Sequence, residues 1–85
     1  MNNQELGDIN GLFQNNFDDT VRAALDGTLT LPAKNLDRLQ CDIALAYGLR
    51  NYGAHNTGTA STVYSRFSEV EQTLFRVLFA AIEFL

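Results

Sequence analysis

The stretch Arg50-Asn51-Tyr52-Gly53-Ala54-His55 carries the side chains best suited to chemistry in this sequence. His55 is the only histidine, and Arg50 precedes it by five positions. A guanidinium is a permanent forked cation that suits phosphate oxygens, and an imidazole exchanges protons near neutral pH. The pair is the minimum needed to hold or cleave a phosphodiester.

A purely structural interpretation of the same residues stays open. Cationic side chains near the end of a helix complement its dipole and bind its free carbonyls, so the pattern could be a helix stop. Five positions on a straight helix place two side chains about 140° apart, and His55 can turn back toward Arg50 only if the helix ends near Gly53. Asn51 would orient the pair or the phosphate, or satisfy backbone groups. Tyr52 would stack on a base, or pack.

Charge and cysteine content restrict the class of protein. The formal net charge of −4 and the isoelectric point of about 4.6 argue against broad, nonspecific nucleic-acid binding but leave room for a small local site. The single cysteine, Cys41, excludes an intrachain disulfide and is expected to be a buried, inert thiol in a reducing cytoplasm. One cysteine and one histidine cannot form a zinc site within a monomer, and we expect no metal or other cofactor. Asp18, Asp19 and Asp42 are expected at solvated helix positions.

The chain of 85 residues forms at most one domain, residues 1–85. The N-terminus has no basic region or apolar signal core, and the apolar run Leu74–Leu85 is too short to span a bilayer, so we expect a cytoplasmic protein without membrane contact. The sequence ends on Phe84-Leu85 without a polar tail. This ending indicates either a buried C-terminal helix or a piece of a longer protein.

Hydrophobic periodicity predicts an all-α fold, a small antiparallel bundle of three main helices at about 5–26, 32–53 and 62–85. Gly27 and Gly53 are expected to end the first two helices, and Pro32 suits the first turn of the second. We predict a loop for residues 28–31, because no second strand is available to pair with them. Ser68 and Glu71 match a capping box, so the third helix begins near Thr62 or at Ser68. The predicted core face of the second helix comprises Leu36, Leu39, Ile43, Ala46, Tyr47 and Leu49.

The third helix is apolar on two sides. Its main stripe comprises Phe67, Val70, Leu74, Val77, Leu78, Ala81 and Leu85, and a second strip comprises Phe75, Phe79 and Ile82. A helix that is apolar on two sides needs two partners, so this second strip is a candidate interface with another copy of the chain.

Residues 49–56, Leu-Arg-Asn-Tyr-Gly-Ala-His-Asn, resemble the signature of the HEPN family (higher eukaryotes and prokaryotes nucleotide-binding domains), in which an arginine, a polar residue and a histidine recur at this spacing. The resemblance covers about residues 33–85. It implies a metal-independent endoribonuclease of a toxin or antiviral defence system. Such an enzyme acts on RNA as a homodimer, and an antitoxin or sensor domain would be a further partner that restrains it. By position, Arg50 and His55 would be the catalytic pair, with Asn51 in support. HEPN domains usually have four or five helices, more than are predicted here. Thr57 stands where some family toxins carry a modifiable tyrosine.

One histidine per chain bears on this mechanism. Metal-free RNA cleavage needs a base for the ribose 2′-OH and an acid for the leaving 5′ oxygen, and one imidazole does not serve both at once. A two-fold dimer would supply two copies of His55 and two of Arg50. The other function that the residues allow is a non-catalytic dimerisation or interaction module of the same fold, which binds a nucleotide or a protein.

Overall fold

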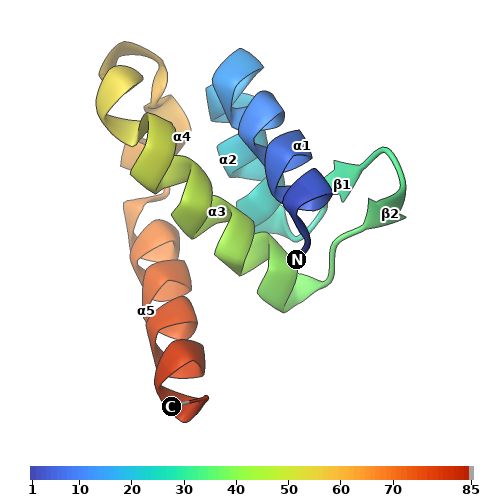
Figure 1. The fold of residues 1–85 in the computed structure, drawn as a ribbon. Helices are drawn as coiled ribbons and strands as arrows, with labels where there is room; N and C mark the ends of the chain where they lie inside the picture. Colours follow the sequence, from blue (N-terminus) through green and yellow to red (C-terminus); the bar gives the residue numbers. More distant parts are fainter. Residues whose placement is uncertain (85) are drawn as a thin grey trace.

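The structure is a computed structural model that describes residues 1–84 and is mostly helical (Figure 1). Leu85, the last residue of the predicted third helix, lies outside the described residues. Within them, the helical elements are α1 (Asn3–Asn15), α2 (Phe17–Asp26), α3 (Arg38–Tyr52), α4 (Ser61–Ser65) and α5 (Phe67–Glu83), with two single 3₁₀ turns, η1 (Gly53–His55) and η2 (Thr57–Thr59).

The first predicted helix is in fact two helices, and its start lies earlier than expected. Asn2 caps α1 because its side-chain oxygen accepts from the Glu5 amide at 2.8 Å, while the Asn2 amide donates to Glu5. Asn16 leaves the helical conformation (φ −143°, ψ 62°) and separates α1 from α2. The break was invisible in the sequence because Phe13 and Phe17 keep a helical spacing across it, with ring centroids 6.1 Å apart. Gly27 ends α2 in the left-handed conformation, as predicted.

Residues 28–35 form a small hairpin, so the predicted loop at 28–31 and the predicted helix start at Pro32 are both wrong. Strand β1 (Thr30–Leu31) pairs antiparallel with β2 (Lys34–Asn35), and Pro32 lies in the turn between them. Two-residue strands leave no periodic signal in a sequence. Helix α3 begins after Asp37, whose side chain accepts from the Gln40 amide at 2.8 Å in a capping box.

Helix α3 is the central element, and it contacts α1, α2 and α5. Gly48 lets the Phe13 ring of α1 pack directly on α3, since a Cβ at this position would lie 2.5 Å from that ring. The core around this contact includes Ile9, Phe13, Val21 and Leu45, all fully buried. The predicted core face was correct in part: Leu36 is buried and Tyr47 and Leu49 pack against the core, but Leu39 and Ile43 are exposed.

Helices α4 and α5 divide the third predicted helix at Arg66. The predicted cap at Ser68 is wrong, because Ser68 lies inside α5 and Arg66, one residue before its start, binds Glu69 with two hydrogen bonds of 2.7 Å. Figure 1 shows α5 continuing from α4 and diverging from the N-terminal half of α3 toward an open end. Phe84 is 86% exposed there, so the expected buried C-terminal helix is not found.

Two aspartates expected in solvent instead fasten elements together. Asp42 of α3 is buried and accepts two hydrogen bonds from Arg76 of α5, at 2.9 and 3.1 Å. Asp18 of α2 accepts from the backbone amide of Thr62 at 2.7 Å, which holds α4. The expectation was correct only for Asp19, which is exposed. Both corrected residues lie at contacts between elements far apart in sequence, where periodicity carries no information.

Candidate functional site

Arg50 and Asn51 lie in the last turn of α3. The exposed Arg50 guanidinium donates from Nη1 to the Asn51 side-chain oxygen at 3.1 Å. The Asn51 side-chain nitrogen donates in turn to the side-chain oxygen of Asn10 on α1 at 3.0 Å. Asn10 was not singled out from the sequence, because a contact across 41 positions leaves no local signal. Arg50 is thus connected to the neighbouring helix through two amide side chains.

His55 follows on η1 and is exposed. Helix α3 ends at Tyr52, close to the predicted end at residue 53, and the chain then tightens into a 3₁₀ turn. Gly53 has φ −59° and ψ −44°, so the turn does not use the left-handed freedom of glycine that the sequence suggested. Arg50 and His55 therefore lie on adjoining segments at one end of the fold. Within residues 1–84, no hydrogen bond or ion pair joins them.

The helix end is capped by a residue other than the histidine. The Asn56 side-chain nitrogen donates to the Tyr52 carbonyl oxygen at 2.6 Å, and the Gly53 amide donates to the Leu49 carbonyl oxygen. The structural interpretation of the sequence expected Arg50 or His55 to bind the free carbonyls at this helix end. Arg50 still lies where a positive charge complements the helix dipole. Asn56 takes the cap, so the imidazole of His55 is not committed to this role.

Arg50 also differs from the other cations in its partners. Among residues 1–84, it is the one lysine or arginine without a carboxylate within 4.0 Å; the paired cations are Arg22, Lys34, Arg38, Arg66 and Arg76. An exposed guanidinium bound only by a neutral amide retains its full charge for an external anion. The molecule is acidic overall, but its unneutralised arginine lies five positions from its one histidine.

Tyr52 is half-buried and packs against the core cluster. Its ring is therefore partly committed to packing, the structural role considered for it. Only the remaining exposed part is accessible for stacking on a base.

The candidate interface strip lies far from this site. Phe75, Phe79 and Ile82 are 51%, 60% and 53% exposed, and the two phenylalanine rings stack at a centroid distance of 6.3 Å. Figure 1 shows α3 running from its contact with α5 toward η1, and α5 continuing in the opposite direction. From the Asp42–Arg76 contact, eight residues of α3 and six of α5 put Arg50 and Ile82 roughly 20 Å apart along the helices, at a rise of about 1.5 Å per residue.

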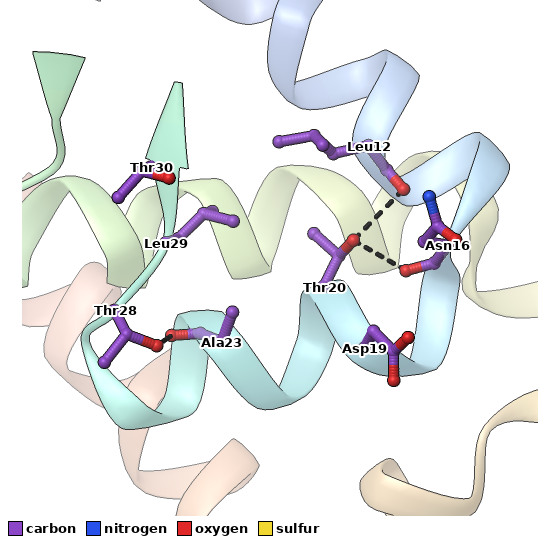
Figure 2. A pocket seen from close by; sticks show the side chains of 8 residues that line it. All are labelled: Leu12, Asn16, Asp19, Thr20, Ala23, Thr28, Leu29 and Thr30. Atoms are coloured by element: carbon purple, nitrogen blue, oxygen red, sulfur yellow. Dashed lines mark hydrogen bonds between the residues drawn. The ribbon is translucent and has the colours of Figure 1, made fainter. Parts of the chain in front are cut away.

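A separate shallow pocket of about 290 Å³ opens between the α1–α2 corner and β1 (Figure 2); its lining residues are Leu12, Asn16, Asp19, Thr20, Ala23, Thr28, Leu29 and Thr30. The Thr20 hydroxyl lies 2.6 Å from the Asn16 carbonyl oxygen, and Asp19 binds Arg22 at 2.8 Å. The pocket contains no residue of the 50–56 stretch, and these polar groups already have partners within the protein.

Cys41 is fully buried, as predicted, and burial raises the pKa of its thiol, which keeps it protonated and unreactive. Residues 1–84 contain no group of three or more histidine, cysteine or acidic side chains that could hold a metal ion. None of the helices in this range has the length and apolar character required to cross a membrane.

Comparison with protein-family models, with curated proteins and with solved structures found no match for this chain.

Proposed function

We propose that this protein is a metal-independent endoribonuclease of the HEPN type, which works as a homodimer in a toxin or antiviral defence setting. The observation that supports this most is the state of Arg50: an exposed guanidinium without a carboxylate partner in the described residues, bound by Asn51 and five positions before the exposed His55. Every other arginine and the lysine have their charge offset by an acidic neighbour.

In the proposed reaction, the ribose 2′-OH attacks the adjacent phosphorus and the 5′ oxygen leaves. His55 transfers the proton, either from the 2′-OH or to the 5′ oxygen, and such acid–base catalysis contributes about 10²–10⁴-fold. Arg50 binds the phosphate and stabilises the negative charge of the transition state, a role whose loss typically costs about 10²–10³-fold in rate. Asn51 orients the guanidinium through the hydrogen bond seen in the structure.

The second His55 comes from a second copy of the chain. The two residues lie at the exposed end formed by α3 and η1, so a two-fold axis at this end would combine two imidazoles and two guanidiniums in one cleft. Tyr64 and Phe67 of the neighbouring α4–α5 segment are 65% and 58% exposed and supply apolar contact area for such an interface. The strip on α5 lies too far along the helix to be the centre of this dimer.

The proposal is tested by incubating a labelled structured RNA with the protein in excess EDTA. Wild type should cleave it and leave 2′,3′-cyclic phosphate ends. His55→Ala and Arg50→Ala should each lose at least about 10²-fold in rate. Lys34→Ala is the matched control, because it removes the same positive charge from the hairpin, away from the site.

The outcomes separate the parts of the proposal. If Lys34→Ala and Arg50→Ala lose the same amount of cleavage rate, Arg50 acts only through the overall charge of the protein and not as a site residue. Cleavage that survives in both site variants rules out the catalytic pair, and cleavage abolished by EDTA rules out the metal-free reaction. Excess inactive His55→Ala added to wild type should inhibit cleavage if the site is shared between two copies, because mixed dimers hold a single imidazole, and an unchanged rate would contradict the shared site.

A non-catalytic interaction module of the same fold is the second candidate function, and the α5 strip favours it. Each phenylalanine side chain has roughly 150–250 Å² of surface, and about half of it is exposed here, so the strip provides up to a few hundred Å² of apolar contact. That area is part of the roughly 800 Å² that each partner gives to a stable interface. Sedimentation of wild type and of Phe75→Ser/Phe79→Ser tests this. Association that is lost in the double variant while RNA remains intact with wild type supports the module over the nuclease.

A further inference from the structure

We propose that Asn10 of α1 is a positioning residue for Arg50, acting through Asn51. This inference rests on the proposed function for its consequence in catalysis, but its geometric basis is independent of it. Asn10 and Asn51 are both half-buried between α1 and α3, and their side chains are joined at 3.0 Å. Asn51 then accepts from the exposed Arg50 at 3.1 Å.

Arg50 determines which atom of the Asn51 amide faces each of its two partners. A guanidinium has five donor hydrogens and no acceptor, so it binds only the oxygen of the Asn51 amide. The nitrogen of that amide must then face α1, where it needs an acceptor. Asn10 provides one with its side-chain oxygen. Without an acceptor at residue 10, the half-buried nitrogen of Asn51 would lose its partner, and the orientation that suits Arg50 would no longer be favoured.

The two asparagines lie beside the contact between the Phe13 ring of α1 and Gly48 of α3. Phe13 follows Asn10 by three positions, and Gly48 precedes Asn51 by three, so each asparagine lies one helical turn from the Phe13–Gly48 contact. A Cβ at residue 48 would lie 2.5 Å from the Phe13 ring, so the ring packs directly on the backbone of α3 there. The hydrogen bond between the asparagines therefore lies beside a tightly packed contact between the two helices.

The function of the connection is to order an exposed arginine before its ligand arrives. A free arginine side chain loses much rotamer freedom when it binds, and a side chain already held in place loses less. Removing the acceptor at residue 10 should loosen Arg50 without changing its charge or its exposure. On the proposed function, the expected effect is a rise of roughly three- to tenfold in KM for RNA with little change in kcat, as for one immobilised side chain.

The test combines a motion measurement with the cleavage assay on the full chain. The ¹⁵N–¹H signal of the Arg50 Nε group should show a high heteronuclear NOE in wild type and a clearly lower one in Asn10→Ala. Asn10→Asp keeps an oxygen acceptor for Asn51 and should restore the NOE. Asn15→Ala is the matched control, because Asn15 is an exposed asparagine of the same helix.

The heteronuclear NOE of the Arg50 Nε group tests the positioning role of Asn10 directly. An unchanged NOE in Asn10→Ala, or an Arg50 that is already mobile in wild type, overturns it whatever the RNA assay shows. A fall in Asn15→Ala equal to that in Asn10→Ala also overturns it, because the effect would then be a general loosening of α1. If wild type cleaves no RNA but the NOE falls only in Asn10→Ala, the positioning role holds and the proposed function fails.

Discussion

The α1–α3 core and the distal half of α5 use the same residue types in opposite ways. Phe13 is fully buried and touches Phe17 edge to face, whereas Phe79 is 60% exposed and stacks only on its neighbour Phe75. In the core, the Phe13 ring of α1 meets Phe17 of α2 and Gly48 of α3. In the distal half of α5, the large apolar side chains Leu78, Phe79 and Ile82 are all more than half exposed. The difference shows that apolar periodicity reports the need for a partner but not where that partner is found.

The largest effect is expected from removing equivalent rings in the two regions. Phe13→Ala should lower the free energy of unfolding by about 3–5 kcal/mol, because it leaves a cavity at the α1–α3 contact. Phe79→Ala should change it by less than about 0.5 kcal/mol in the monomer, as for an exposed site. Urea denaturation at low protein concentration measures both. A large loss in Phe79→Ala would mean that the strip is covered in solution.

The next effect concerns the ion pair that attaches α5 to the core. Arg76→Met should destabilise the protein by about 1.5–3 kcal/mol, because it removes two charged hydrogen bonds from the buried Asp42 carboxylate. The remaining partner, the Nε of Arg38, lies 3.6 Å away. Glu71→Met is a suitable control on the exposed side of α5. Equal denaturation midpoints for the two variants would contradict a stabilising role for the pair.

Gly48 inside α3 and Gly53, the first residue after α3, should respond differently to alanine. Gly48→Ala should cost about 1–3 kcal/mol from overpacking against Phe13. Gly53→Ala should be neutral or stabilising by up to about 1 kcal/mol, since its φ of −59° suits any residue and its added Cβ would lie 4.0 Å from Leu49. Thermal unfolding followed by circular dichroism compares them. A strongly destabilising Gly53→Ala would show that the η1 turn needs glycine after all.

The smallest effect is a pH dependence at the α2–α4 contact. The hydrogen bond from the Thr62 amide holds the pKa of the Asp18 carboxyl below its ordinary value of 3.8. The carboxylate therefore stabilises the fold fully above that value, and the contribution disappears as the pH falls through the lower pKa of the folded state.

Asp18→Asn keeps an oxygen acceptor but does not titrate, so its stability should decline less steeply than wild type below about pH 4. Asp18→Ala should lose about 0.5–2 kcal/mol at neutral pH, as for a lost helix cap. Urea denaturation at a series of pH values distinguishes the two. Parallel pH profiles for wild type and Asp18→Asn would exclude this role of the carboxyl.

Much of the helix content could be predicted from the sequence, but the buried face of α3 could not. The spacing of apolar residues located the helical regions, and Gly27 marked the end of α2. The buried residues of helix α3, however, are Cys41, Ala44, Leu45 and Gly48, together with the charged Asp42. They lie on more than one side of the helix. Residue type alone does not predict that a glycine or an aspartate will be buried, because its burial depends on a partner from another element. Phe13 and Arg76 are those partners, and they come from other helices.

For the candidate site, the sequence supplied the members but not their connections. Arg50, Asn51 and His55 follow from residue type and spacing, and their catalytic role remains a proposal. Two features of Arg50 could not be predicted: its lack of a carboxylate partner within the part of the chain that the structure describes, and its link to Asn10. Both depend on which side chains the fold brings together. The hairpin was missed for the same reason, because two-residue strands exist only through their pairing.

The sequence by itself determined where helices form, that Cys41 is buried and that α5 carries more apolar surface than one neighbour can cover, because local spacing and side-chain chemistry govern these properties. Tertiary structure alone decided that Asp42 could be buried, that Gly48 had to be small and that no carboxylate of residues 1–84 pairs with Arg50. Each of these outcomes depends on a contact between residues at least 34 positions apart or on the absence of one, and no local pattern encodes such contacts.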